Sequence, residues 1–437
     1  MPRKLTKSEK LYRRAEQIIT GGVHSNYRYS TPHPRYYVRA KGPYVWDVDG
    51  NKYIDCICNM GACILGHAHP KVMDAVKRQL TSGLTNGLET ELSVEVARLL
   101  NEMVPSAEVI KFSNTGTEAV MHAIQIARAY TRKDRIAKLE GGYDGWYDYV
   151  LMSTHPRLEE AGSANQPNTV PGTSGLAESA RGTVILPFNN IKDTVRIIRE
   201  NKDDLAAVVM EPVMFNVGCV TPDPQYLKAV REVTEDLGII LVFDEVITGF
   251  RMAPGGAQEY YGVIPDMSTF AKAIANGFPL AAVVGKREIM QTTDPKTGNV
   301  MFYGTYNAHQ AALAAAYATL RELKTGRVQK HLHEASKWLV KEVEELSADL
   351  GVKAIMQSIA GKFQVYFTSN APVDYRSAML TDQKKYGAYH VAALECDVLM
   401  HSSPTGHQGL TSAHSKDTLL LISRAIERGL ESAKALG

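Results

Sequence analysis

Short, continuous apolar runs recur through the middle of the chain, and each is followed by small or polar residues. Residues 205–210 and 239–243 form two such runs, and 268–271 is a third candidate. Runs of this length with branched side chains are typical of strands buried on both faces of a parallel sheet. Residues 224–237 have the spacing of an amphipathic helix closed by Gly238. The alternation of strands and helices therefore predicts an α/β fold built on a mostly parallel sheet.

The ends of the chain show other patterns. Apolar residues at a helical spacing predict a helix over 5–19, which ends at a Thr-Gly-Gly turn, and a second helix over 72–80. The same spacing predicts long helices over 312–350. Residues 44–57 alternate around the turn signal Asp49-Gly50 and predict a β-hairpin. Strand and helix signals alternate over the remainder of the chain, as expected for a second, smaller α/β domain.

A carboxylate and a lysine follow two of the predicted strands. Asp244 comes directly after 239–243, and Lys272 directly after 268–271. Ligands of open α/β sheets bind beyond the carboxyl ends of the strands. A lysine among small apolar residues is expected to have a lowered pKa and to be nucleophilic. A pyridoxal phosphate enzyme needs this pair, because lysine forms a Schiff base with the cofactor and aspartate keeps its ring nitrogen protonated. The spacing alone leaves open a loop-capping Asp244 and a solvated Lys272.

A second informative stretch lies at residues 109–130. The strand-like VIKF runs into Ser-Asn-Thr-Gly-Thr, and apolar residues at a helical spacing follow. The N–H groups and the dipole at the start of a helix favour an anion, so this turn is a candidate phosphate site. As a bare pattern, however, any capped helix after a strand looks similar.

Several motifs occur together in a recognisable order. The run FDEVITGFR, followed by GGAQEYYGVIPD and AKAIANGFPLAA, resembles the class III (ω-type) aminotransferases, most closely their glutamate-1-semialdehyde 2,1-aminomutase branch. The resemblance extends from about Gly21 to about His414. It implies the pyridoxal phosphate fold of type I, as in aspartate aminotransferase, and pyridoxal 5'-phosphate as cofactor. It also implies that residues 1–75 contribute to the small domain, 76–315 form the large cofactor-binding domain, and 316–437 form the C-terminal small domain.

The resemblance assigns cofactor contacts to several residues. The family's phosphate loop, Ser/Asn-x-Gly-Thr-Glu-Ala, corresponds to a stretch that contains Gly116 and Thr117. GGYDGW resembles the family's Gly-x-Tyr-His-Gly, so Tyr143 is expected against the face of the pyridine ring. Asp144 replaces the histidine of that motif, whose role is therefore not carried over. Asn216, after a Glu-Pro-Val segment, is expected to reach the phenolic oxygen.

The resemblance also extends to Val246, Thr305 and the substrate side. Val246, in FDEVITGFR, is expected to contact the cofactor, together with Asp244 and Lys272. Thr305 lies in GTYNAH and is expected to reach the phosphate of a neighbouring subunit, which implies a homodimer with shared active sites. Arg28 lies in a segment resembling Gly-Gly-Val-x-Ser-x-x-Arg, where arginine pairs with the substrate carboxylate. The alternative is that Arg28 is a solvated loop residue and that the nearby Arg35 or Arg39 is the true partner. Met60 stands where the aminomutases have a tryptophan that contacts substrate.

Three functions follow as hypotheses. The first is an aminotransferase that moves an amino group between a carboxylate-bearing amino acid and a keto acid or aldehyde. The alternative is glutamate-1-semialdehyde 2,1-aminomutase, from which the chain departs at Met60, at Asp144 and in the aperiodic segment 153–182. That segment is either a lid that gates the site or a solvated loop. A non-catalytic binding protein is disfavoured because Lys272, Asp244 and Thr117 are all present.

Composition narrows the setting. The 437 residues carry a formal net charge of +2, with 44% apolar and 22% charged residues, which favours neither nucleic acid nor a membrane surface. No apolar run is long enough to span a bilayer, and no signal peptide is evident. Cys56 and Cys58 alternate within a strand-like segment and are expected to be buried, reduced thiols. His67 and His69 lack a third ligand, so no metal site is expected. We therefore expect a cytoplasmic enzyme whose partners are a small-molecule amino donor and acceptor.

Overall fold

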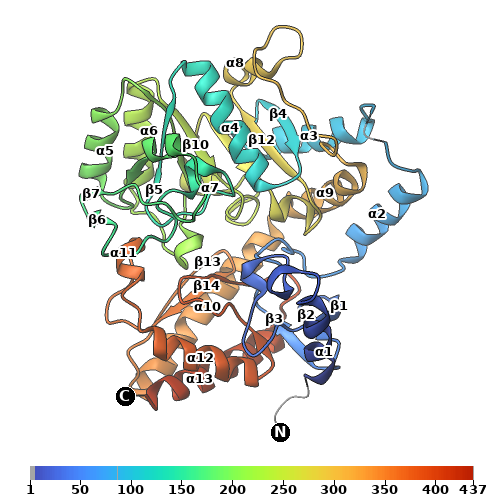
Figure 1. Ribbon diagram of the computed structural model, residues 1–437. Coiled ribbons are helices and arrows are strands. Elements are labelled where there is room, and N and C mark those ends of the chain that lie inside the picture. The colour runs from blue at the N-terminus through green and yellow to red at the C-terminus, as the bar shows by residue number, and fades with distance from the viewer. Residues whose placement is uncertain (1–4, 86, 437) are drawn as a thin grey trace.

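The larger part of the molecule is organised around one seven-stranded sheet (Figure 1). The computed structural model describes residues 5–85 and 87–436. In spatial order the strands of this sheet are β4 (Val109–Ser113), β12 (Ala281–Gly285), β11 (Met267–Phe270), β10 (Ile240–Asp244), β9 (Leu205–Met210), β5 (Arg135–Leu139) and β8 (Val184–Leu186). β12 is antiparallel to both of its neighbours, and the other pairings are parallel. The expected strands are confirmed to within about one residue, and the sheet is mostly parallel as predicted.

Both faces of this sheet are covered, as the continuous apolar runs require. Ile240 and Val242 of β10 belong to a buried cluster that includes residues of α4 (Gly116–Thr131). Leu241 and Phe243 point the other way and pack with residues of α5 (Ile191–Glu200) and α6 (Tyr226–Asp236). Side chains alternate across a strand, so a strand between two helical layers is apolar at every position. Shorter helices of this part are α3 (Glu91–Met103), α7 (Ala257–Tyr261) and α8 (Arg287–Met290).

The smaller part is built from both ends of the chain. One sheet has the order β1 (Tyr37–Lys41), β2 (Tyr44–Asp47), β3 (Lys52–Asp55) and β15 (Val398–Leu399), and another the order β13 (Ile355–Ile359), β14 (Lys362–Tyr366) and β16 (Gln408–Gly409). The predicted hairpin is confirmed as β2 and β3, which pair antiparallel. β3 and β15 pair in parallel, so the N-terminal and C-terminal segments lie side by side in Figure 1.

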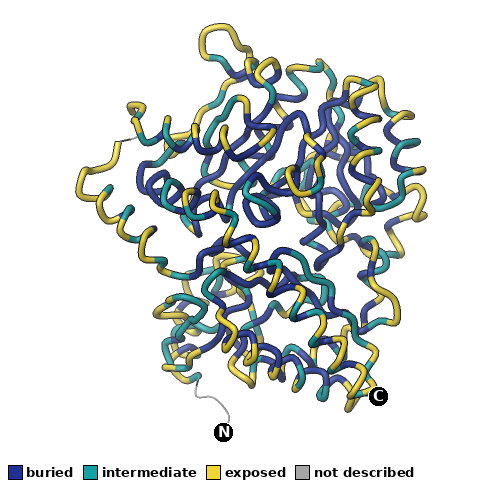
Figure 2. The backbone as a smooth tube through the Cα atoms, turned by 180° about the vertical axis from the view of Figure 1, so that it is seen from behind, coloured by how far each residue is buried: buried dark blue, intermediate teal, exposed yellow. Residues whose placement is uncertain are grey.

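The longer helices not yet named pack partly on these smaller sheets and partly on the larger part. They are α1 (Thr6–Ala15), α2 (Pro70–Thr81), α9 (Gln310–Leu323), α10 (Arg327–Leu350), α12 (Gln383–Glu395) and α13 (Lys416–Lys434). Figure 2 shows the buried backbone concentrated in the interior of both parts. Within the described residues, no helix is both long and apolar enough to cross a membrane. The division of the chain at residues 75 and 315 stays a prediction.

Two local predictions were wrong. α1 ends at Ala15, although a helix was expected to residue 19. Cys56 and Cys58 lie after the end of β3 and outside any strand. The carboxylate of Asp55 accepts hydrogen bonds from the backbone N–H groups of Ile57 and Cys58 at 2.8 and 3.0 Å, which turns the chain there. Both thiols are buried and unpaired with another cysteine, as expected.

Residues 153–182 are ordered despite their lack of a sequence period. They contain the two-stranded β6 (Gly162–Ser163) and β7 (Gln166–Pro167). Arg376 of α11 (Tyr375–Ala378) donates to the carbonyls of Ala161 and Gly162, both at 2.8 Å, and forms a two-bond ion pair with Glu140. A guanidinium from the C-terminal part therefore ties this segment to the end of β5.

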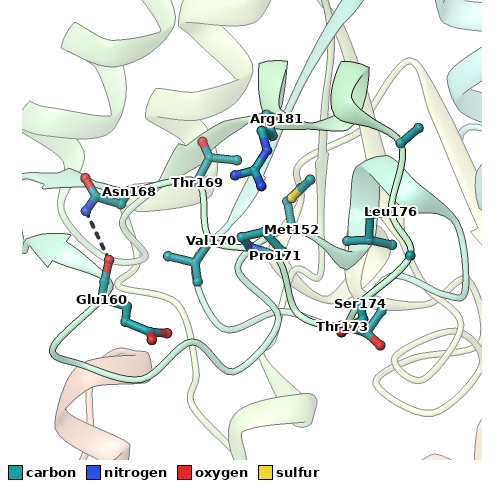
Figure 3. Close-up of a pocket in the computed structure, with 12 residues that line it drawn as sticks. Met152, Glu160, Asn168, Thr169, Val170, Pro171, Thr173, Ser174, Leu176 and Arg181 are labelled. Carbon is teal, nitrogen blue, oxygen red and sulfur yellow. Dashed lines mark hydrogen bonds between the residues drawn. The ribbon is translucent and has the colours of Figure 1, made fainter.

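The same segment encloses a cavity of about 820 Å³ (Figure 3). Its walls are Met152 and residues between 160 and 181, and one wall is tied by the amide of Asn168, which donates to the carbonyl of Glu160 at 3.0 Å. This cavity contains none of the predicted site residues.

Candidate active site

The predicted chemistry comes together in another pocket, of about 180 Å³. It lies beyond the carboxyl ends of β9, β10 and β11, where Glu211, Asp244 and Lys272 stand. The pocket is lined by Gly116, Thr117, Tyr143, Asp144, Gly145, Glu211, Asn216, Asp244, Val246, Ile247 and Lys272. Every predicted cofactor residue except Thr305 is therefore in one pocket. This placement follows from the sheet, because parallel strands present their carboxyl ends at one edge.

Asp244 closes β10 and turns one oxygen to the protein. Its Oδ1 accepts a hydrogen bond from the N–H of Val246 at 2.9 Å and from the hydroxyl of Thr269 at 3.2 Å. Its Oδ2 receives none from the described residues. Burial raises the pKa of Asp244 to about 7, and the nearby charge of Asp144 adds to that effect. The carboxylate is thus held in place with one oxygen left for a ligand.

The other half of the pair, Lys272, lies on the same edge. It begins the short 3₁₀ helix η6 (Lys272–Ala275) directly after β11, with a left-handed φ of 47°. Its amine is half-buried and makes no hydrogen bond or ion pair with the part of the chain that the structure describes. Burial lowers the pKa of Lys272 to about 8, while Asp244 and Glu211 oppose that shift. Lys272 is thus partly buried at the pocket, whereas Asp244 both caps the turn through Oδ1 and lines the pocket.

The neighbouring Glu245 has a purely local task. It is fully buried, and its carboxylate accepts hydrogen bonds from the N–H groups of Ala257 and Gln258 at 2.6 and 3.1 Å and from the hydroxyl of Thr248 at 2.9 Å. These bonds fix the loop between β10 and α7. Of the two adjacent carboxylates, only Asp244 faces the pocket.

The N-terminus of α4 forms the opposite wall. Thr115 caps the helix by accepting a hydrogen bond from the N–H of Glu118 at 3.2 Å, and α4 then begins at Gly116. A Cβ on Gly116 would stand 2.9 Å from a methyl carbon of Val246, so only glycine permits this close approach. The hydroxyl of Thr117 accepts from the N–H of Trp146 at 3.0 Å. The first N–H groups of α4 have no partner within a helix, which suits an anion.

Tyr143 and Asn216 occupy a third wall and are joined by a hydrogen bond. The Asn216 amide donates to the carbonyl oxygen of Tyr143 at 3.1 Å. Beside them, Glu211 is buried, and burial raises the pKa of its carboxyl to about 8. Its Oε2 accepts from the N–H of Phe215 at 3.2 Å, while Oε1 has no hydrogen bond among the described residues. The sequence shows Glu211 only as part of the Glu-Pro-Val segment, which does not predict that Glu211 lines the pocket.

The sequence patterns do not single out Lys138, and they identify Asp144 without giving it a role. Lys138 is a fully buried residue of β5, and its Nζ lies 3.5 Å from Oδ2 of Asp144, which lines the pocket. The lysine stands between Ala137 and Leu139 in the strand RIAKL, and a charged residue among these buried apolar ones is the signal that could have identified it.

Three predicted residues lie outside the pocket. Thr305 is exposed, in a stretch that also exposes Met301 and Tyr303. Arg28 is exposed in the short helix η2 (Asn26–Arg28) and has no ion pair within the described ranges. Met60 is half-buried in a turn where its φ is 56°. The structure of one subunit does not bring these residues to Lys272.

The two closely spaced histidines have separate surroundings. The Nε2 of His67 lies 2.7 Å from Oδ2 of Asp55, and this pairing raises the pKa of the imidazole to about 10 against the opposing effect of burial. His69 precedes α2, and partial burial lowers the pKa of its imidazole. His67 therefore forms an ion pair with Asp55, which joins the end of β3 to the turn before α2.

Comparison with known proteins accounts for this geometry. The family model of class-III aminotransferases matches residues 26–390. The chain belongs to the class-III aminotransferase family. It is 40% identical to a glutamate-1-semialdehyde 2,1-aminomutase of Methanocaldococcus jannaschii, over 92% of this chain and 93% of that protein. Among solved structures, an omega-transaminase of Sphaerobacter thermophilus superposes with a TM-score of 0.93 at 34% identity, over 98% and 97% of the two chains. A transaminase with bound pyridoxal phosphate superposes with a TM-score of 0.89 at 29% identity, over 99% and 98%.

These matches confirm the predicted fold class and the cofactor. The chain has the fold of the pyridoxal-phosphate-dependent transaminases, and pyridoxal 5'-phosphate is the cofactor of its family. The residues present fit that group. Asp244 has a free oxygen, Lys272 a free amine of lowered pKa, and α4 offers its first N–H groups to a phosphate. The relatives named above are transaminases or the intramolecular aminomutase, and both classes were expected from the sequence.

Proposed function

We propose that this enzyme is an aminotransferase acting on carboxylate-bearing substrates, with Lys272 and Asp244 as its catalytic residues. The observation that carries the proposal is their arrangement: an unbonded amine of lowered pKa and a carboxylate with a free oxygen share one pocket of about 180 Å³. The amino donor would be an amino acid and the acceptor a keto acid or aldehyde. The enzyme would act in the cytoplasm on these small molecules.

The pocket residues divide the work between binding and proton transfer. When bound, pyridoxal phosphate supplies an aldehyde that takes up amino groups and a ring that accepts electrons. Asp244 would hold a proton at the ring nitrogen through its free Oδ2. Gly116 and Thr117 would bind the phosphate at the start of α4, beside Val246, with Tyr143 against the ring face and Asn216 at the phenolic oxygen.

Lys272 would act first as nucleophile and then as base. Both roles need the neutral amine, and a pKa of about 8 leaves a useful neutral fraction near neutral pH. Its amine would remove a proton from the carbon that carries the substrate amino group and return that proton at another carbon. The half-buried position of Lys272 keeps bulk water from competing for the proton.

Substrate binding and assembly require residues that lie away from the pocket. Arg28 would pair with the substrate carboxylate through its planar fork, with Met60 beside the substrate. Thr305 would reach the phosphate of a partner subunit in a homodimer. Its exposure, together with that of Met301 and Tyr303, leaves this stretch available for a second copy of the chain.

A second candidate is glutamate-1-semialdehyde 2,1-aminomutase. The name of the curated relative at 40% identity favours this function over the first. The substitutions at Met60 and Asp144, and the likeness to an omega-transaminase, favour the aminotransferase. The same pocket would serve both reactions, because the aminomutase moves an amino group within one molecule.

Product analysis distinguishes the two candidates. The holoenzyme is mixed with glutamate-1-semialdehyde alone and, separately, with a panel of α-, β- and γ-amino acids and simple amines, while cofactor absorbance is followed. An aminotransferase shifts the cofactor absorbance with a donor and turns over only after an acceptor is added. An aminomutase converts the semialdehyde fully to an isomer of equal mass with no acceptor. Turnover by Lys272→Ala at the wild-type rate would exclude the proposed mechanism.

Arg28→Ala tests the substrate class. Loss of a charge-assisted pair is worth roughly 1.5–3 kcal/mol, so KM for a carboxylated donor should rise about 10- to 100-fold, with the slow reaction of a neutral amine almost unchanged. Arg39→Ala is the matched control, because Arg39 stacks on Trp46 at 4.3 Å. Equal losses on both kinds of donor would show that Arg28 supports its loop and does not bind the carboxylate.

A further inference from the structure

Asp144 is a buried carboxylate without a hydrogen-bond donor. It is 2% exposed and lines the pocket between Tyr143 and Gly145. Among the described residues, neither of its oxygens accepts a hydrogen bond. Buried carboxylates ordinarily have donors, because removing the charge from water is costly. Among the described residues, the ammonium of Lys138 lies 3.5 Å from Oδ2, so this carboxylate on the pocket wall has an ionic partner but no hydrogen-bond donor.

The paired cation, Lys138, is held in place by other bonds. Its ammonium donates to the carbonyls of Gly142 at 2.6 Å and Met152 at 3.1 Å and to the hydroxyl of Thr154 at 3.3 Å. These three bonds use all the donors of a lysine. The ammonium therefore stays 3.5 Å from Asp144 as a fixed charge behind the pocket wall, and it leaves the carboxylate oriented but unbonded.

The negative charge of Asp144 affects the pKa values of the other acids in the pocket. Its negative charge contributes to the raised pKa of both Asp244 and Glu211, after burial. The charged and titratable groups that face this cluster are Lys138 on β5, His155 in the 153–182 segment, Glu211 after β9, Asp244 on β10 and Lys272 after β11. Three carboxyl groups thus line the pocket in which the proposed function puts the cofactor ring.

We propose that Asp144 is a positioning residue that, with Asp244, holds a positive charge on the ring nitrogen of the bound cofactor, with Lys138 as its fixed counter-ion. This inference rests on the proposed function of the pocket. Asp244 would accept the ring N–H, and the negative charge of Asp144 in the same pocket would favour the same proton. The proton shared by Asp244 and the ring then stays bound to a higher pH. The histidine of the family motif cannot supply this negative charge, so the arrangement belongs to this chain.

The experiment measures the ring proton directly. Apo-protein is loaded with pyridoxal phosphate labelled with ¹⁵N in the ring, and the ¹⁵N chemical shift is followed from pH 5 to 10. A nearby charge typically moves a pKa by 1–3 units, so Asp144→Asn should lose the ring proton at least about one pH unit below the wild type. Lys138→Met should shift it the same way, because Asp144 without its counter-ion takes up a proton itself.

Controls separate this role from folding. Asp236→Asn makes the same chemical change at an exposed site on α6 and should leave the titration unaltered. Asp144→His, the residue of the family motif, is a second variant that should also lower the titration point. Loaded Asp144→Asn or Asp144→His protein that keeps the wild-type ring titration would overturn the inference and leave the proposed function intact. Wild-type protein that does not bind the cofactor covalently at Lys272 would overturn both.

Discussion

The lowered pKa of Lys272 gives a quantitative prediction for how fast the protein takes up its cofactor. Burial brings the pKa of this amine from 10.5 to about 8. At pH 7 roughly one amine in ten is then neutral, against roughly one in 3,000 for a solvated lysine. Because only the neutral amine attacks an aldehyde, the rate of covalent loading should rise about tenfold from pH 6 to 7 and about fivefold from pH 7 to 8. Above the pKa the amine is already neutral, so the rate should level off.

Stopped-flow absorbance on mixing apo-protein with excess pyridoxal phosphate measures this rate between pH 6 and 10. Nα-acetyl-lysine serves as the reference amine and corrects for titration of the cofactor itself. Lys272→Ala serves as the blank, and the exposed Lys286→Ala, whose lysine pairs with Asp266, should load like the wild type. A loading rate that keeps rising to pH 10, in parallel with the reference amine, would refute the reasoning, since it would mean that Lys272 has an ordinary pKa and is solvated.

Three other outcomes are expected. Asp244→Asn should still bind the cofactor but lower kcat on the order of 10³-fold, because an amide does not stabilise a protonated ring; near-normal kcat would point to another acid. Thr305→Glu and Lys272→Ala should each be inactive, yet co-expression should restore about a quarter of wild-type activity, since mixed dimers contain one complete site if Thr305 serves the partner. No recovery would place Thr305 in its own subunit's site or outside any site. Arg376→Ala should speed limited proteolysis within 153–182, because it removes the bonds to the carbonyls of Ala161 and Gly162 and leaves the buried carboxylate of Glu140 without its ion pair; an unchanged digestion pattern would show that other contacts hold the segment.

The sequence predicted most where a residue's environment is set by its immediate neighbours. A buried strand followed by a turn identifies both the strand and the edge at which Asp244 and Lys272 stand, because the sheet fixes where strand ends meet. The start of α4 was predictable for the same reason, because the residue that caps the helix and the first residues of the helix are consecutive in sequence. The sequence placed the end of α1 too late and extended a strand through Cys56 and Cys58. In the second case, the carboxylate of Asp55 ends the strand by accepting hydrogen bonds from the backbone just after it.

The remainder depended on contacts distant in sequence. The order of residues 153–182 comes from Arg376, whose guanidinium reaches carbonyls 214 and 215 positions earlier in the chain. No periodic pattern in the segment itself records that bond. Lys138 pairs with Asp144 because the turn after β5 folds back over the strand, and this return is not evident from either residue type. Arg28 and Thr305 are exposed and lie outside the pocket, and their roles stay predictions.

The parallel pairing of β3 with β15 constrains when the molecule can be completed during its synthesis. β3 leaves the ribosome early, and its partner at residues 398–399 is made about 340 residues later, roughly 15–70 s at ordinary elongation rates. Throughout that time the hairpin of β2 and β3 has an open edge and no cover from α12 or α13. Lys272 and the strands around it are by then already made. A cofactor pocket can therefore begin to form on the nascent chain, whereas the part that carries the N-terminus closes only when translation is nearly finished.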